Sequence, residues 1–159
     1  MRTMSVSVYK FDELSDNAKS KAIERFRDGM DCTFWVHDGL DSIKKFCAEF
    51  NVKLTAWEVG AHYPISFKTD ATNKNFRGLK LKDFDKEAMP TGYCVDSDLR
   101  YKFHDEFTQT GDALYAFNEA VEAGFRSIRA DMEYQLTDEA ITESIECNEY
   151  EFTEDGKLV

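Results

Sequence analysis

The sequence lacks the features that mark several large classes of protein. Its 159 residues include two prolines and eight glycines, too few for a collagen-like chain or for long flexible linkers. No stretch approaches the roughly 18 consecutive apolar residues of a membrane-spanning helix. Residues 1–14 contain no apolar core of the kind found in secretory signal peptides. We therefore expect a soluble protein of the cytoplasm that does not bind membranes.

Apolar and acidic residues are both abundant. Hydrophobic residues make up 42% of the chain and include thirteen phenylalanines and seven tyrosines, which argues against intrinsic disorder. A chain of this length is typical of one domain, able to bury roughly 68–70% of its unfolded surface. We therefore predict a single domain over residues 1–159. Acidic residues outnumber basic ones by 31 to 20, which gives a net charge of −11.

The cysteines indicate neither a metal site nor a redox site. Cys32, Cys47, Cys94 and Cys147 form no CxxC pair. Without a signal peptide, free thiols are favoured over disulfides. Cys47 lies on an apolar helical stripe and is expected to be a small core residue.

The three histidines allow one enzymatic alternative, a metal-dependent hydrolase. His37-Asp38 and His104-Asp105 are HD dipeptides of the kind that metal phosphohydrolases use, but that chemistry needs further ligands and only His62 remains. The sequence contains no glycine-rich phosphate loop, GxSxG, HExxH or EF-hand pattern. We therefore predict that the protein is not an enzyme and has no catalytic residues, metal ligands or cofactor.

Hydrophobic periodicity predicts an α+β fold, with a small antiparallel sheet packed by several helices and one long helix near the C-terminus. Residues 69–98 leave two alternatives, a further strand or a loop that contacts a partner. The expected elements are a strand at 5–9, helices at 16–28 and 33–50, a hairpin of strands at 52–56 and 63–67, a short helix around 99–107, a long helix at 112–135, a last helix from 138, and a C-terminal strand with an Asp-Gly turn.

Two helix starts have clear local signals. Ser15 and Thr137 are good N-cap residues, because their hydroxyls can accept a free backbone N–H at the first turn. Asp16 and Asp138 follow them, where a negative charge is favourable against the helix dipole. Gly29 is a reasonable end for the first helix.

The acidic residues are concentrated toward the C-terminus. Residues 1–90 carry a net charge of +1, residues 91–159 carry −12, and residues 130–156 contain ten acidic residues and no basic one. On the last predicted helix, Glu139, Glu143 and Glu146 project opposite Ile141 and Ile145. Such a face is either a solvated surface that keeps the protein soluble or a surface that binds a basic partner.

The predicted partner-binding residues come from this acidic region. One helix is not enough to imitate DNA, because carboxylates four residues apart lie ~5–6 Å from each other, whereas a duplex has a phosphate charge per ~1.7 Å of axis. A DNA mimic would therefore also need acids of the long helix and the tail. The predicted residues are Asp131, Glu133, Asp138, Glu139, Glu143, Glu146, Glu149 and Glu151.

Direct binding of nucleic acid is not expected. The chain has one basic cluster, and aspartates among its members dilute its charge. We expect this cluster to pair with the acidic half of the chain. Its members are Lys68, Lys74, Arg77, Lys80, Lys82 and Lys86.

Both ends of the chain resemble one group of small phage and prophage proteins. The segment VYKFDELSDNAKSKAIERFRDG at 8–29 resembles their opening, a short strand followed by an ELSDxAKxxA helix start. The segment DMEYQLTDEAITESIECNEYEFTEDGKLV at 131–159 resembles their ending, with its NEYEFTEDGK motif. The resemblance implies an accessory protein of a mobile element in a bacterial cytoplasm, and some members of the group are labelled as antitoxins.

Charge and resemblance together predict an acidic inhibitor of a host defence complex. The expected target is a CRISPR effector or a restriction nuclease, blocked at its basic nucleic-acid-binding surface, with DNA mimicry as one form of that mechanism. The first alternative is an antitoxin that binds its toxin through Phe34, Trp35, Trp57 and Tyr63. The second is the metal-dependent hydrolase with His37 and His104.

Overall fold

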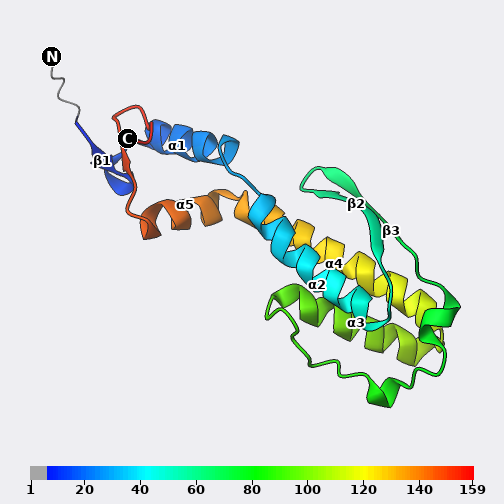
Figure 1. The fold of residues 1–159 in the computed structure, drawn as a ribbon. Coiled ribbons are helices and arrows are strands. Elements are labelled where there is room, and N and C mark those ends of the chain that lie inside the picture. The colour runs from blue at the N-terminus through cyan, green and yellow to red at the C-terminus, as the bar shows by residue number, and fades with distance from the viewer. Residues whose placement is uncertain (1–6) are drawn as a thin grey trace, which may run out of the picture. The chain divides into compact units, whose positions relative to one another are not determined.

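The computed structural model describes residues 7–159, which divide into two compact units. We call residues 32–132 the central unit, and residues 7–31 with 133–159 the terminal unit. The prediction of a single domain over residues 1–159 stays a prediction. The described residues form five α-helices and two separate two-stranded antiparallel sheets, which confirms the α+β class (Figure 1).

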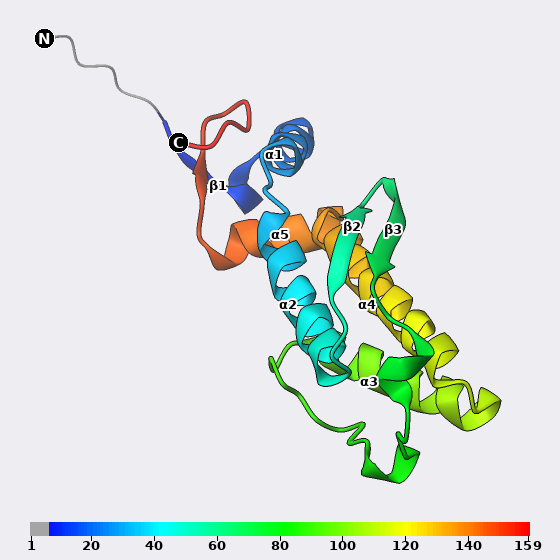
Figure 2. The same cartoon turned by 45° about the vertical axis from the view of Figure 1, so that its right-hand side comes forward.

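The central unit contains three helices and one β-hairpin. Helices α2, α3 and α4 pack side by side, and the hairpin lies over α4 (Figures 1 and 2). No helix among residues 7–159 is long and apolar enough to cross a membrane. The elements are α2 (Thr33–Glu49), β2 (Leu54–Gly60), β3 (Tyr63–Thr69), the 3-10 helices η2 (Asn73–Phe76) and η3 (Leu81–Asp83), α3 (Cys94–Thr110) and α4 (Ala113–Gln135), whose last three residues belong to the terminal unit.

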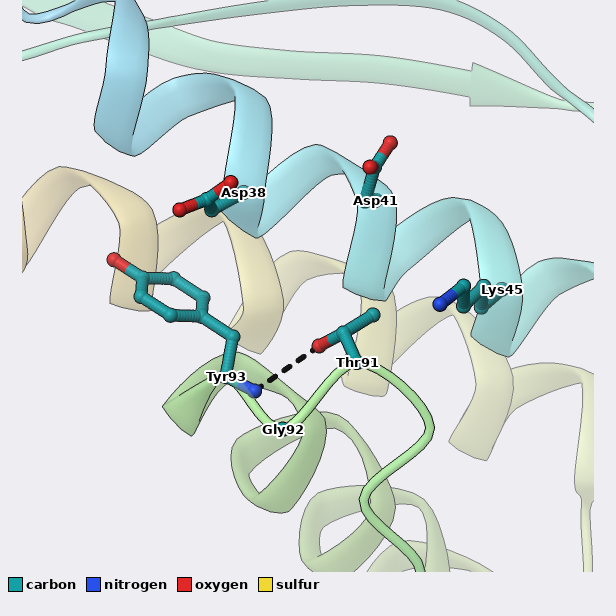
Figure 3. Close-up of a pocket in the computed structure, with 6 residues that line it drawn as sticks. All are labelled: Asp38, Asp41, Lys45, Thr91, Gly92 and Tyr93. Atoms are coloured by element: carbon teal, nitrogen blue, oxygen red, sulfur yellow. Dashed lines mark hydrogen bonds between the residues drawn. The ribbon is translucent and has the colours of Figure 1, made fainter.

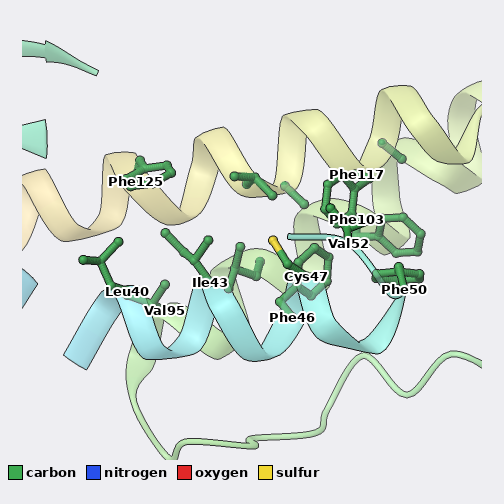
Figure 4. Packing of buried hydrophobic residues seen from close by; sticks show 14 of the residues in the cluster. Leu40, Ile43, Phe46, Cys47, Phe50, Val52, Val95, Phe103, Phe117 and Phe125 are labelled. Carbon is green, nitrogen blue, oxygen red and sulfur yellow. The ribbon is translucent and has the colours of Figure 1, made fainter. Parts of the chain in front are cut away.

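Phenylalanine rings from all three helices fill the core of the central unit (Figure 4). Phe46 of α2 stacks on Phe117 of α4 with ring centroids 5.6 Å apart, and Phe103 of α3 lies 5.9 Å from Phe46. Gly124 allows α4 to approach this core closely, because a Cβ at that position would lie 2.7 Å from Cδ2 of Leu99. Cys47 is buried here as predicted, and burial, with a smaller contribution from Asp70, raises the pKa of its thiol to about 12.

The hairpin packs on the long helix α4 through an aromatic contact. Trp57 of β2 is paired with Phe67 of β3 in the antiparallel register. The Phe67 ring stacks on Phe125 of α4 with centroids 5.5 Å apart. One face of the hairpin is thereby covered by α4, while Trp57 remains 43% exposed.

The terminal unit joins the two ends of the chain. Its elements are β1 (Tyr9–Lys10), the 3-10 helix η1 (Phe11–Glu13), α1 (Asp16–Asp28), α5 (Asp138–Cys147) and β4 (Glu151–Phe152). β1 and β4 pair antiparallel, and α1 and α5 enclose a small core of Phe11, Leu14, Ala18, Ala22, Ile141, Ile145 and Phe152.

The N-caps of both helices are confirmed. The hydroxyl of Ser15 accepts a hydrogen bond from the Ala18 N–H at 3.3 Å, and that of Thr137 accepts one from the Ala140 N–H at 3.2 Å. Gly29 ends α1 as expected.

Three details differ from the sequence predictions. The first strand is at Tyr9–Lys10, and residues 5 and 6 of its predicted range lie outside the described residues. Residues 69–98 contain the two 3-10 helices and the start of α3, so the strand alternative is wrong. α3 is also longer than the short helix expected around 99–107.

Arg100 gives the irregular segment its order. Its Nε donates to the carbonyl of Asp85 at 2.7 Å, its guanidinium lies 4.6 Å from the Phe84 ring centroid, and it forms an ion pair with Glu49. These contacts join α2 and α3 to a loop that has no hydrophobic periodicity of its own. The conformation around Phe84 and Asp85 therefore depends on residues that are distant in the sequence.

Candidate partner-binding surfaces

Helix α5 presents three of the predicted acidic residues on one exposed face. Ile141 and Ile145 are fully buried against the core of the terminal unit, which fixes how the helix is turned. Glu139, Glu143 and Glu146 therefore lie on the solvent side, and all three are exposed. None of them forms an ion pair with a lysine, arginine or histidine of residues 7–159. We call these three residues the α5 acidic face.

Acidic residues on either side of this face are neutralised within the terminal unit. Asp138 forms an ion pair with Arg27, whose Nε also donates to the carbonyl of Leu136 at 2.9 Å. Glu149 lies 3.8 Å from the Nζ of Lys10. The basic residues of the N-terminal segment thus reach the two ends of α5 but not its middle.

A third ion pair joins the tail to α1. Arg25 lies 3.4 Å from the carboxylate of Asp155. The pKa of Asp155 is lowered chiefly by a hydrogen bond from the Thr153 hydroxyl and then by Arg25. Glu133 and Glu151, the other predicted residues of this unit, are exposed on the end of α4 and on β4.

The net charge is unevenly divided between the units. Residues 1–31 and 133–159 contain fifteen acidic and seven basic residues, a net charge of −8. Residues 32–132 contain sixteen acidic and thirteen basic residues, a net charge of −3. The charge that distinguishes this protein therefore belongs mainly to the unit that contains α5.

Asp131 is set apart from the other seven predicted residues. It belongs to the central unit, is half-buried, and accepts a hydrogen bond from the Tyr93 hydroxyl at 2.5 Å. Burial and this hydrogen bond raise the pKa of Tyr93, in that order, with smaller contributions from nearby acidic groups. Asp131 is thus engaged within its own unit.

A polar cleft of about 280 Å³ lies between α2 and the loop that precedes α3 (Figure 3). α2 contributes Asp38, Asp41 and Lys45. The loop and the residue that starts α3 contribute Thr91, Gly92 and Tyr93. The sequence analysis considered Asp38 only as part of an HD dipeptide. The i, i+3 spacing of the two aspartates on a helix with a buried opposite face was the signal that could have found it.

The aromatic residues of the antitoxin alternative are largely exposed. Phe34 is 68% exposed and Tyr63 is 66% exposed, while Trp35 is half-buried. Trp57 borders a cavity of about 310 Å³ whose other lining residues are mostly apolar and include Val36 and Leu40.

The structure bears on two further features, the histidines considered as metal ligands and the basic cluster expected to pair with the acidic half of the chain. The side chains of residues 7–159 contain no group of three or more His, Cys, Asp or Glu that could hold a metal ion. The Nδ1 of His104 lies 3.5 Å from the Oδ1 of Asp105. The members of the basic cluster, Lys68 to Lys86, form no ion pair with acidic residues in the described part of the chain. Lys86 instead lies over the ring of Tyr101, 5.3 Å from its centroid. The expected pairing with the acidic half is not found.

Comparisons with known proteins find no similar family, no similar curated protein and no similar solved structure. The resemblance of the two chain ends to phage and prophage proteins therefore stays a prediction.

Proposed function

We propose that the protein acts by binding, and that the α5 acidic face docks on a basic surface of a protein partner. The observation that carries this proposal is that Glu139, Glu143 and Glu146 are exposed together and form no ion pair with a basic residue among residues 7–159. By contrast, Asp138 at the start of the same helix and Glu149 just after its end each form an ion pair with a basic residue.

Unpaired like charges on one helix face favour association with a cation. Carboxylates at i, i+3 and i, i+4 positions repel one another by a few tenths of a kcal/mol, and a basic surface relieves that repulsion. Opposite potentials also raise the association rate and orient the encounter. Ion pairs of this kind are screened by salt, so the complex should weaken steeply as ionic strength rises.

The partner class follows from the resemblance of the chain ends. Phage and prophage accessory proteins act in bacteria that defend themselves with nucleases, and the nucleic-acid channels of such enzymes are basic. A host defence complex, either a CRISPR effector or a restriction nuclease, is therefore the proposed target. α5 has ten residues and is ~15 Å long, so a competitor for a longer channel would also use Glu133 and Glu151.

A second candidate function is an antitoxin, supported by the exposed aromatic side chains. Phe34, Trp57 and Tyr63 are large and exposed, and Trp57 borders the apolar cavity. Aromatic residues are enriched where protein interfaces are buried. A toxin held in this way would stay bound at high salt.

Charge reversal on α5 tests the main proposal. Tagged wild-type protein and a Glu139→Lys/Glu143→Lys/Glu146→Lys variant are compared in affinity capture from a bacterial lysate, with salt-step elution and mass spectrometry. We expect a nucleic-acid enzyme that is released by salt and is lost with the variant, with its affinity reduced by roughly tenfold or more when measured with the purified enzyme. The matched control is Glu58→Lys/Asp83→Lys/Glu119→Lys, which makes the same change of net charge in the central unit.

The results separate the candidates clearly. Loss of the enzyme with both variants would mean that net charge alone matters, and retention with both would remove the α5 acidic face from the mechanism. Capture of a small partner that resists salt, and that is lost on Trp57→Ala, would favour the antitoxin.

A further inference from the structure

The cleft between α2 and the loop before α3 has one acidic wall and one aromatic wall. Asp38 and Asp41 lie one helical turn apart on α2, and the Tyr93 ring lies opposite Asp38, whereas the Asp41 carboxylate is turned away from that ring (Figure 3). The cleft volume of about 280 Å³ is enough for the end of a long side chain. It belongs to the central unit and shares no residue with the α5 acidic face.

The lysine that lines the cleft, Lys45, is hydrogen-bonded within the protein. Lys45 donates from its Nζ to the carbonyl of Pro90 at 3.1 Å, at the other end of the cleft from Tyr93 (Figure 3). Asp38 and Asp41 form no ion pair with any basic residue of the described part of the chain. Two carboxylates therefore border this space without an ion pair, and the one lysine on the cleft wall is held at its far end by a neutral carbonyl.

A buried carboxylate adds to the negative potential of the cleft. Asp96 is 1% exposed, and its Oδ2 accepts hydrogen bonds from the N–H groups of Thr91 and Gly92 at 2.8 and 3.0 Å and from the Thr91 hydroxyl at 2.8 Å. Its Oδ1 is buried and has no hydrogen-bond partner in residues 7–159. Because Thr91 and Gly92 line the cleft, this carboxylate lies directly behind the cleft wall. A buried carboxylate with one unpaired oxygen is costly, and a nearby cation reduces that cost.

The ring of Tyr93 is held in place by its own hydroxyl. That hydroxyl donates to Asp131, which also brings a further carboxylate close to the ring. The side of the ring that borders the cleft remains available to a ligand (Figure 3). A cation over a tyrosine ring gains about 0.5–2 kcal/mol, more when water is excluded.

We propose that this cleft binds the guanidinium group of an arginine side chain from a protein partner. Arginine fits better than lysine because its planar group can donate two parallel hydrogen bonds to a carboxylate and stack on an aromatic ring at the same time. In this arrangement the guanidinium N–H groups donate to Asp38, the plane of the group lies against Tyr93, and Asp41 on the next turn adds a second negative charge to the cleft. The site is separate from the α5 acidic face, so either proposal can fail without the other.

A short capped peptide, acetyl-Gly-Arg-Gly-amide, is the probe for this site. The full-length ¹⁵N-labelled protein is titrated at low salt and followed by NMR chemical shifts. We expect saturable shifts at the amides of Thr91, Gly92 and Tyr93, with a dissociation constant on the order of 1 mM. The peptide with citrulline in place of arginine, which keeps the shape and loses the charge, should give no saturable shifts, and the lysine peptide should bind several-fold more weakly.

Two variants and one control locate the binding. Asp38→Asn/Asp41→Asn should weaken binding by roughly tenfold or more, and Asp41→Asn alone by a smaller factor. The control Glu58→Gln/Asp83→Asn removes two exposed charges elsewhere in the central unit and should bind like the wild type. Asp38 and Asp41 carry no ion pair, so their removal should leave the dispersion of the amide spectrum unchanged.

Three results would overturn the proposal. They are equal binding of the citrulline peptide, unchanged affinity in the double variant, and shifts that do not saturate at Thr91 to Tyr93. The Glu139→Lys/Glu143→Lys/Glu146→Lys variant should bind the peptide as the wild type does, which separates this test from the test of the α5 acidic face.

Discussion

The central unit and the terminal unit are held together in different ways. In the central unit, the ring centroid of Phe46 lies within 6 Å of those of Phe50, Phe103 and Phe117. Three of the four ion pairs in this unit join residues no more than four apart. In the terminal unit the core is small, and the ion pairs of Lys10, Arg25 and Arg27 each join the N-terminal segment to the C-terminal one.

This difference bears on which charges are available to a partner. A unit with little apolar surface to bury uses charged residues to hold distant segments together, although each exposed pair contributes little by itself. Lys10, Arg25 and Arg27 are engaged in this way. The middle of α5 lies between these contacts, and its carboxylates remain available.

The largest loss of stability should come from truncating a buried ring of the aromatic core. Phe117 is fully buried and contacts the rings of Phe46, Phe50 and Phe76, so Phe117→Ala should reduce the free energy of unfolding by about 3–5 kcal/mol. Both tryptophans belong to the central unit, so their fluorescence during urea unfolding reports on this unit.

The matched change in the other unit is Phe152→Ala, which removes the ring that lies 6.0 Å from that of Phe11. Its effect should be greatest on amide exchange in α1 and α5. A loss below 1 kcal/mol for Phe117→Ala would contradict the assignment of the rings as the main source of stability.

A smaller effect is expected at the turn that closes the terminal unit. Gly156 has a φ of 77°, and a Cβ there would overlap the carbonyl oxygen of Ala18 on α1. Gly156→Ala should therefore cost roughly 3 kcal/mol, measured as lost protection from amide exchange in α1. Gly78 has a φ of 78° with open space around it, so Gly78→Ala should cost only about 1–2 kcal/mol. Equal costs would show that the close approach to α1 is unimportant.

The smallest effect is expected at the ion pairs. Arg27→Gln removes the contact with Asp138 and the hydrogen bond to the Leu136 carbonyl, and should destabilise the terminal unit by about 1 kcal/mol. Asp138→Asn keeps the bond to Leu136 and should cost only a few tenths of a kcal/mol. Exchange protection of α5 measured at low and high salt checks both values, and a larger loss in Asp138→Asn would reverse the assigned order.

Sequence reasoning succeeded where the signal was local. The caps at Ser15 and Thr137 and the apolar stripes of α2 and α4 depend on residues within a few positions, and all were predicted. It failed at residues 69–98, where contacts from distant residues fix the chain: Arg100 of α3 holds Phe84 and Asp85, and Asn75 donates to the carbonyls of Phe50 and Asn51.

Sequence reasoning was likewise successful for some of the candidate partner-binding residues and unsuccessful for others. Counting charges along the chain identified the acidic region and the exposed face of α5. It also grouped Asp131 with that region, although the hydrogen bond that engages Asp131 comes from Tyr93, 38 residues earlier. The polar cleft was missed, because its walls come from α2 and from a loop that follows some forty residues later.

The sequence by itself determined the α+β class, the helices with their buried faces, and the excess of negative charge, because periodicity and composition are properties of neighbouring residues. Only the tertiary structure decided which carboxylates are neutralised and which remain free. An ion pair depends on the distance between side chains, and Arg27 and Asp138 are 111 residues apart in the sequence. Folding brings such residues together, and the charges it leaves unpaired are the ones a partner can use.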